Sequence, residues 1–103
     1  MKRHPKISNL MLEIHQCLDQ GRYLDTRHAF ERQIQRNISR IEIIQVLKRG
    51  YHERQNDHFD EAYNAWNYAI KGKTVDGREL RIIVSFDENN MLIVTAIDLN
   101  LRG

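Results

Sequence analysis

The chain has 103 residues, of which 41% are hydrophobic and 29% charged, and its formal net charge is +2. This length suits one domain with one core, and the composition excludes a disordered chain. Because no apolar run reaches membrane-spanning length and Cys17 is the lone cysteine, we expect a single cytoplasmic domain over residues 1–103 without an intramolecular disulfide or a membrane partner.

The charge is unevenly distributed along the chain. Residues 1–54 carry 11 Lys and Arg against 6 acidic residues, whereas residues 55–103 carry 5 against 8. Eleven of the sixteen cations are arginines, whose forked guanidinium suits contact with phosphate. A nucleic acid is therefore a candidate partner, although such an asymmetry also occurs in ordinary soluble domains.

Three helices are predicted in the region of about 8–49. Ser8 or Asn9 can cap the first, which ends before Gly21. The second follows Asp25 or Thr26 and runs to about residue 36, with Ala29, Phe30 and Ile34 as its apolar contacts. The third starts at a Ser39-x-x-Glu42 capping box and ends at Gly50.

The second half, over about 51–99, shows the alternation typical of strands. We expect a short edge strand at 51–55, a loop at 56–63, and strands at 66–73, 78–86 and 91–99. Asp76-Gly77 is a hairpin turn pair, and the short connections require antiparallel pairing. The fold class is therefore α+β, with three N-terminal helices packed on a small antiparallel β-sheet.

The strand at 78–86 has two distinct faces. Its core face is predicted to carry Leu80, Ile82, Val84 and Phe86. Arg78 shares this parity but lies at the turn, where its side chain is expected to reach solvent. Arg81 belongs to the opposite face, and Lys71 and Lys73 on the preceding strand extend that face as possible phosphate contacts.

A polar row lies on the second helix, where His28, Arg32 and Arg36 follow one another at intervals of four residues. On a helical projection it lies opposite Phe30 and Ile34, as a solvated face would. The row contains no acidic residue, however, and a histidine beside an arginine can carry out proton transfer at a phosphate. Both interpretations remain open at this point.

Two segments carry a family resemblance, RHAFERQIQRNISRIEIIQVLKRG and WNYAIKGKTVDGRELRIIVSFDENNMLIVTAIDL. They resemble a bacterial domain family of unknown function across roughly residues 22–99. That family looks related to small toxin ribonucleases of the RelE/ParE type, including BrnT-like and MqsR-like toxins. The resemblance implies a RelE/ParE-like toxin fold and a metal-independent RNA endonuclease, without a cofactor, that is neutralised by an antitoxin protein.

The same resemblance places functional residues in this sequence. The family's helix histidine and arginine correspond to His28 and Arg32, and its final strand threonine to Thr95. Its aromatic strand corresponds to Trp66 and Tyr68, and its turn to residues 76–78. RelE-type toxins often carry a basic or tyrosyl group near the carboxyl terminus, where this chain offers only Arg102, so the general acid stays unassigned.

The predicted site combines these residues. The expected catalytic residues are His28, Arg32, Arg81 and Thr95, and the expected RNA-binding residues are Arg36, Trp66, Tyr68, Lys71, Lys73 and Arg78. Trp66 and Tyr68 could instead pack against a helix. The spacing of the histidines matches no metal-ligand motif. The alternatives are a non-catalytic RNA-binding module and a protein-interaction domain that adds a partner strand at residues 51–55; a homodimer is also open.

Overall fold

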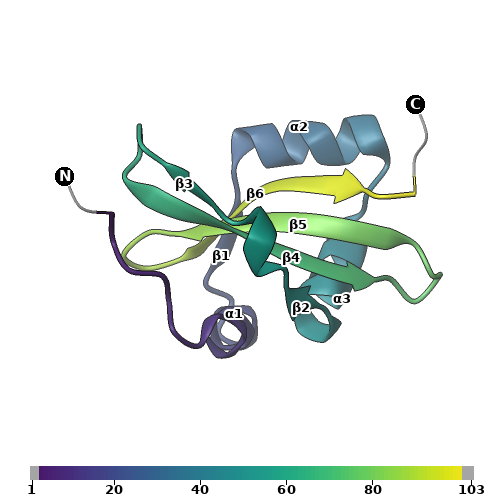
Figure 1. The fold of residues 1–103 in the computed structure, drawn as a ribbon. Helices are drawn as coiled ribbons and strands as arrows, with labels where there is room; N and C mark the ends of the chain where they lie inside the picture. Colours follow the sequence, from purple (N-terminus) through teal and green to yellow (C-terminus); the bar gives the residue numbers. More distant parts are fainter. Residues whose placement is uncertain (1–2, 101–103) are drawn as a thin grey trace.

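The computed structural model describes residues 3–100. Within this range the chain forms an α+β fold with three α-helices, one 3-10 helix and a six-stranded sheet (Figure 1). The helices are α1 (Leu10–Asp19), α2 (Arg27–Arg36), α3 (Arg40–Arg49) and the 3-10 helix η1 (Arg54–Asn56). The strands are β1 (Tyr23–Asp25), β2 (Tyr51–His52), β3 (His58–Asp60), β4 (Ala65–Lys73), β5 (Glu79–Phe86) and β6 (Met91–Asp98).

The sheet is mixed, which corrects the expectation of an antiparallel one. Its order is β1-β6-β5-β4-β2, with β3 pairing β4 off this path. β4, β5 and β6 form the predicted antiparallel meander, but β1 runs parallel to β6, with Tyr23 opposite Met91 and Asp25 opposite Ile93. Three residues are too few to show a strand alternation, so the sequence did not predict β1.

The expected loop at 56–63 contains a further strand, β3. It pairs antiparallel with the start of β4, so that Phe59 lies opposite Trp66. The two rings meet edge to face at 5.3 Å between centroids, and Phe59 is buried. Because Phe59 stands alone among polar residues, this segment lacks the pattern by which strands are predicted.

One buried cluster joins the three helices to the sheet. The expected core side chains Leu80, Ile82 and Val84 of β5 are fully buried, and they pack in one cluster with residues such as Ile14 of α1 and Ile43 of α3. α3 packs on β4 and β5, whereas α2 packs on β6. We call the side of the sheet that faces away from α3 the open face; most side chains of β4 to β6 on this side are partly exposed.

The orientation of α2 differs from the prediction. Ala29 and Gln33 are buried, whereas Phe30 and Ile34 are 55% and 68% exposed. The side-chain amide of Gln33 donates a hydrogen bond of 3.1 Å to Asp25 Oδ1, and this bond compensates for the burial of a polar group. A projection based on hydrophobicity alone therefore selected the wrong side of this helix.

Two glycines let the end of α3 approach the sheet closely. Gly50, which follows α3, lies against Gly72 of β4. A Cβ added at Gly50 would lie 2.5 Å from the carbonyl oxygen of Lys71 and 2.6 Å from that of Val46. This contact brings β2 directly after α3 to the side of β4, and so places Tyr51 opposite Lys71.

Candidate nucleic-acid interface

α2 lies along the part of β6 that extends beyond β1. The backbone N–H of Thr26 donates to the Ile93 carbonyl at 3.0 Å, at the start of the helix. Near its end, Arg36 Nη1 donates to the Ala96 carbonyl at 2.6 Å and to Thr95 Oγ1 at 3.4 Å. The helix therefore satisfies backbone groups of an otherwise unpaired strand edge, and its basic row borders the side chain of Thr95.

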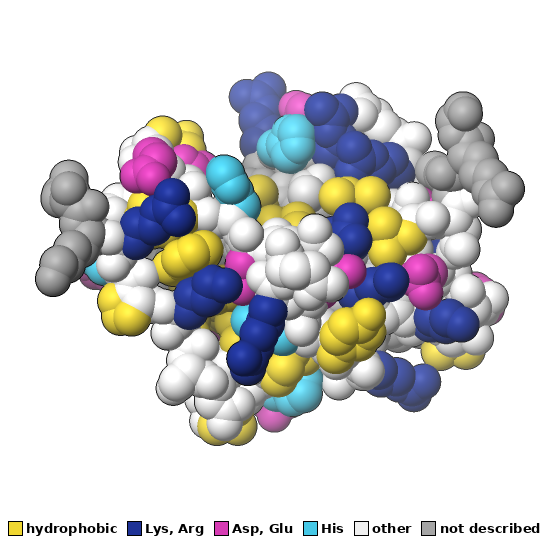
Figure 2. Space-filling model, viewed as in Figure 1, with side chains coloured by type: hydrophobic (Ala, Val, Ile, Leu, Met, Phe, Trp, Pro, Cys, Tyr) yellow, Lys and Arg dark blue, Asp and Glu magenta, His cyan; other side chains and the backbone are white. Residues whose placement is uncertain are grey.

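A transverse row of side chains crosses the open face over four strands. Tyr51 of β2 lies opposite Lys71 of β4, which lies opposite Arg81 of β5, which lies opposite Ile97 of β6. Thr95 is the diagonal neighbour of Arg81 on β6, within reach of a long side chain. In Figure 2, Lys and Arg side chains over α2 border apolar side chains over β5 and β6, with further cations below them.

Arg81 is held in a forked ion pair with Glu53. Arg81 Nε lies 2.6 Å from Glu53 Oε1, and Nη2 lies 3.1 Å from Oε2. The hydrogen bond from Arg81 lowers the pKa of Glu53, and the same bond raises the pKa of Arg81. Sequence reasoning missed Glu53, although its parity with Tyr51 on a strand facing two cations was an available signal.

His28 and Arg32 lie further from this row. His28 is exposed, and in residues 3–100 its side chain has no hydrogen bond. Arg32 is half-buried, and its Nη1 donates to Gln35 Oε1 at 2.5 Å. Because eight residues of helix span about 12 Å, His28 lies two turns from Arg36 along the side of β6. The structure thus brings Arg36 to Thr95, and it pairs Arg81 with Glu53 on the β4 side of β5, next to Lys71. His28 lies near the start of α2, at the other end of the basic row.

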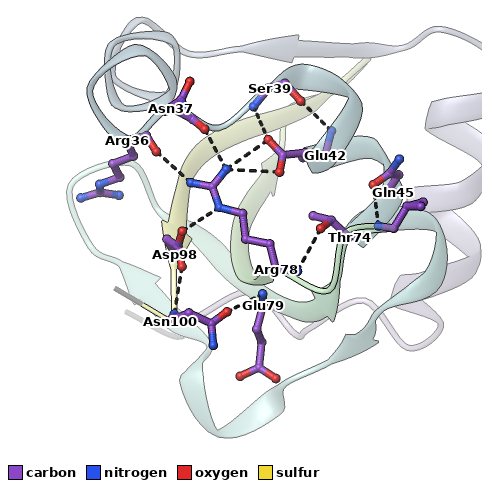
Figure 3. A network of polar contacts seen from close by, with 11 residues as sticks. Arg36, Asn37, Ser39, Glu42, Gln45, Thr74, Arg78, Glu79, Asp98 and Asn100 are labelled. Atoms are coloured by element: carbon purple, nitrogen blue, oxygen red, sulfur yellow. Dashed lines mark hydrogen bonds and ion pairs between the residues drawn. The ribbon is translucent and has the colours of Figure 1, made fainter. Parts of the chain in front are cut away.

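Arg78 is held in a structural network and is only about one-quarter exposed, which corrects its expected place in solvent (Figure 3). Its Nε donates to Asp98 Oδ2 at 2.7 Å, and its Nη1 lies 3.2 Å from Glu42 Oε2. Nη1 and Nη2 also donate to the carbonyls of Asn37 and Arg36. The hydrogen bond to Asp98 raises the pKa of Arg78, and the hydrogen bond to Glu42 raises it further by a smaller amount. These contacts occupy the guanidinium and leave little of it for RNA.

The two predicted stacking residues are both covered by the amino-terminal segment, Tyr68 fully and Trp66 in part. Tyr68 is 3% exposed, and its hydroxyl oxygen accepts the Ile7 N–H at 3.0 Å. Trp66 is half-buried; its indole N–H donates to the His4 carbonyl at 2.6 Å, and the Lys6 ammonium lies 4.7 Å from its ring centroid. The ring of Tyr68 is not accessible to a base.

The remaining predicted residues lie at the periphery. Lys73 is exposed at the end of β4, and Asp76 and Gly77 form the turn before β5, where Gly77 has a positive φ of 81°. Arg102 lies outside the described residues. Among residues 3–100, no group of three or more His, Cys, Asp or Glu side chains is placed to hold a metal ion. No helix in the same range is long and apolar enough to cross a membrane.

A groove of about 960 Å³ lies on the other side of α2. Four of its lining side chains are large, apolar and more than half exposed, namely Phe30, Ile34, Ile41 and Val75. Three of its polar residues are engaged within the chain: Ser39 and Glu42 form the capping box, and Arg78 joins the network described above. The groove therefore combines exposed apolar side chains with polar ones, several of which already have partners.

The family model described as "Domain of unknown function (DUF4258)" matches residues 26–98. The chain belongs to this family. Neither the curated proteins nor the solved structures include a match to the chain. The DUF4258 match begins at the residue that caps α2 and ends at the last residue of β6. It therefore includes the basic row of α2, the whole transverse row of the open face and the groove.

Proposed function

We propose that the chain is a metal-independent RNA endonuclease, the toxin of a toxin–antitoxin pair, with a RelE/ParE-like fold and a cytoplasmic site of action. The contact of Arg36 with Thr95 is the main support, because it joins the basic row of α2 to the face of the sheet that also carries Arg81 and Lys71. RNA would lie along the boundary between α2 and the sheet, where cations from both elements meet its phosphates.

The proposed reaction needs no metal. The 2′-oxygen of the RNA attacks the adjacent phosphorus while the bond from phosphorus to the 5′-oxygen breaks, and the products end in a 2′,3′-cyclic phosphate and a 5′-hydroxyl. His28 takes the proton from the 2′-hydroxyl, and solvent protonates the leaving oxygen. Arg32, one turn from His28, stabilises the charge on the phosphorane. Arg36 and Thr95, a further turn along α2, bind and orient a neighbouring phosphate, and Arg81, oriented by Glu53, binds another.

Incubation of purified protein with a mixed-sequence single-stranded RNA in EDTA tests the reaction. We expect cleavage with cyclic phosphate ends, and a loss of about 10²- to 10⁴-fold in rate for His28→Ala. The matched control is His58→Ala, because His58 is also exposed but lies on β3. Both variants should unfold at the temperature of the wild type.

Two results would contradict the enzyme. RNA left intact both in EDTA and with added divalent ions would exclude cleavage by the isolated chain. Salt-sensitive RNA binding without cleavage, unchanged by His28→Ala, would favour the alternative of a non-catalytic RNA-binding module. Growth arrest on induced expression, relieved by His28→Ala and by Arg32→Ala, would support the toxin in cells.

The apolar groove favours a protein partner as part of the same proposal. Four of its apolar side chains are more than half exposed, and Ser39, Glu42 and Arg78 already have partners within the chain, so we propose that apolar side chains of an antitoxin helix fill it. Residues 26–49 carry six Lys and Arg against two Glu, which favours an acidic helix. Ile34→Glu should abolish a complex with the neighbouring-gene product, whereas Leu12→Glu on α1 should not; a stable homodimer without that product would contradict this occupant.

A further inference from the structure

Tyr51 stands apart from the other aromatic residues near the interface. It is 56% exposed and lies on the open face, directly opposite Lys71. In the described part of the chain it has no ring contact with another aromatic side chain and no side-chain hydrogen bond. An exposed aromatic ring beside cations is the arrangement by which single-stranded nucleic acids are bound.

The neighbours of Tyr51 include two cations that can contact a phosphate, although each is paired with a carboxylate. Lys71 and Arg81 lie one and two strands away, at about 4.8 Å per strand. The Lys71 ammonium is 3.7 Å from Glu79, and Arg81 is oriented by Glu53. Both side chains remain about one-quarter exposed. A base on the Tyr51 ring therefore places its own phosphate within reach of two oriented cations.

We propose that Tyr51 is the stacking site for an unpaired base of single-stranded RNA, with Lys71 and Arg81 binding the adjoining phosphate. This inference rests on the proposed function and deepens it by naming the substrate class. Duplex RNA does not fit, because its bases are stacked on one another and not open to an aromatic side chain.

Tyr63 provides a matched control within the same chain. It is 82% exposed, but it lies in the turn between β3 and β4. Its backbone N–H donates to Asp60 Oδ1, and Glu61 is two residues away in the sequence. The carboxylates of Asp60 and Glu61 disfavour a phosphate beside this ring, and the Arg3 guanidinium nearby is paired with Glu61 at 3.2 Å. Any effect that comes only from removing a surface tyrosine will therefore appear equally in Tyr63→Ala.

The test measures binding without cleavage. The probe is a single-stranded RNA with 2′-O-methyl groups throughout, which lacks the attacking hydroxyl, and with one 2-aminopurine whose fluorescence falls on stacking. We expect Tyr51→Ala to weaken binding about tenfold or more and to lose the quenching, Tyr51→Phe to retain both, and Tyr63→Ala to match the wild type. The slope of the logarithm of the binding constant against the logarithm of the salt concentration should stay unchanged in Tyr51→Ala. In Lys71→Gln this slope should become shallower by the amount expected for about one lost phosphate contact.

The outcomes separate this inference from the proposed nuclease. One result would overturn the stacking site alone: Tyr51→Ala binds the probe and quenches its fluorescence as Tyr63→Ala does, while the wild type binds and cleaves RNA. Equal affinity of wild type for a duplex of the same sequence also overturns it. Tyr51-dependent binding without cleavage of unmodified RNA supports the stacking site and contradicts the nuclease. Absence of RNA binding at low salt overturns both.

Discussion

Arg78 and Asp98 form an ion pair, with Nε 2.7 Å from Oδ2, that joins the start of β5 to the end of β6. The same guanidinium donates to two carbonyls at the end of α2 and to Glu42 on α3. One side chain thus ties both later helices to the sheet. Residues that contact an RNA cannot be identified by charge alone, because the guanidinium of Arg78 is already bound to groups within the fold.

Arg78→Ala should therefore act on stability. The substitution leaves two carboxylates and two carbonyls without this donor, and we expect the free energy of unfolding to fall by about 3 kcal/mol. Lys73→Ala, on an exposed residue of the same hairpin, should change it by less than about 0.5 kcal/mol. Urea unfolding followed by circular dichroism measures both values, and equal stability of the two variants would contradict the structural role of Arg78.

Glu53 predicts a pH dependence of stability. The pKa of Glu53 in the folded chain lies below the ordinary value for a glutamate, chiefly because of the hydrogen bond from Arg81. Its stabilising contribution is therefore fully present above about pH 4.5 and is lost as the pH falls through the folded pKa. The difference in unfolding free energy between wild type and Glu53→Gln should be largest at pH 6 and shrink toward pH 3.

Thermal unfolding across pH 3–7 measures this difference, with Glu88→Gln as the control. Glu88 is exposed in the turn between β5 and β6, so its substitution should leave the pH profile close to that of the wild type. A Glu53→Gln profile parallel to that of the wild type would show that the ion pair does not contribute.

The burial of α3 and the orientation of α2 predict losses of stability of very different size for two isoleucines. Ile43 on α3 is fully buried, and Ile43→Ala should lower the free energy of unfolding by about 2–5 kcal/mol. Ile34 on α2 is 68% exposed, and Ile34→Ala should cost less than about 0.5 kcal/mol. A large loss for Ile34→Ala would instead support the side of the helix that hydrophobicity alone predicts.

The close approach of α3 to β4 predicts that Gly50 resists substitution. A Cβ at Gly50 would meet two backbone carbonyl oxygens that cannot move aside, so Gly50→Ala should destabilise the fold by about 3 kcal/mol or more. Gly21 is the control: an added Cβ there meets open space, and only its positive φ of 68° opposes alanine, at about 1 kcal/mol. Equal losses for both variants, measured by urea unfolding, would contradict this contact.

The parts of the fold with regular patterns were predictable from the sequence. The capping box of Ser39 and Glu42 is present, and α1 buries Leu10, Ile14 and Cys17 as its apolar stripe indicates. β4, β5 and β6 follow from their alternation and short turns. β1 and β3 did not follow, because each has only three residues and so shows no clear alternation. β1 also pairs with β6, which is far away in the sequence.

The candidate site was less predictable than the fold. The cations of the open face were assigned by parity, but parity cannot show that Arg36 would reach Thr95 across 59 residues of sequence. Nor does it reveal that Tyr68 is covered by the amino-terminal segment through the bond from Ile7. Both depend on contacts between distant segments, which no local pattern records.

The parallel pairing of β1 with β6 has a consequence for the order in which the fold can form. β1 precedes α2, yet its partner is β6, with Tyr23 opposite Met91. α2 packs on β6 as well, so neither element has its final neighbour until residues 91–98 have been synthesised. The contact between Arg36 and Thr95 therefore depends on pairing between segments separated by more than half of the chain, and contacts of this kind form slowly.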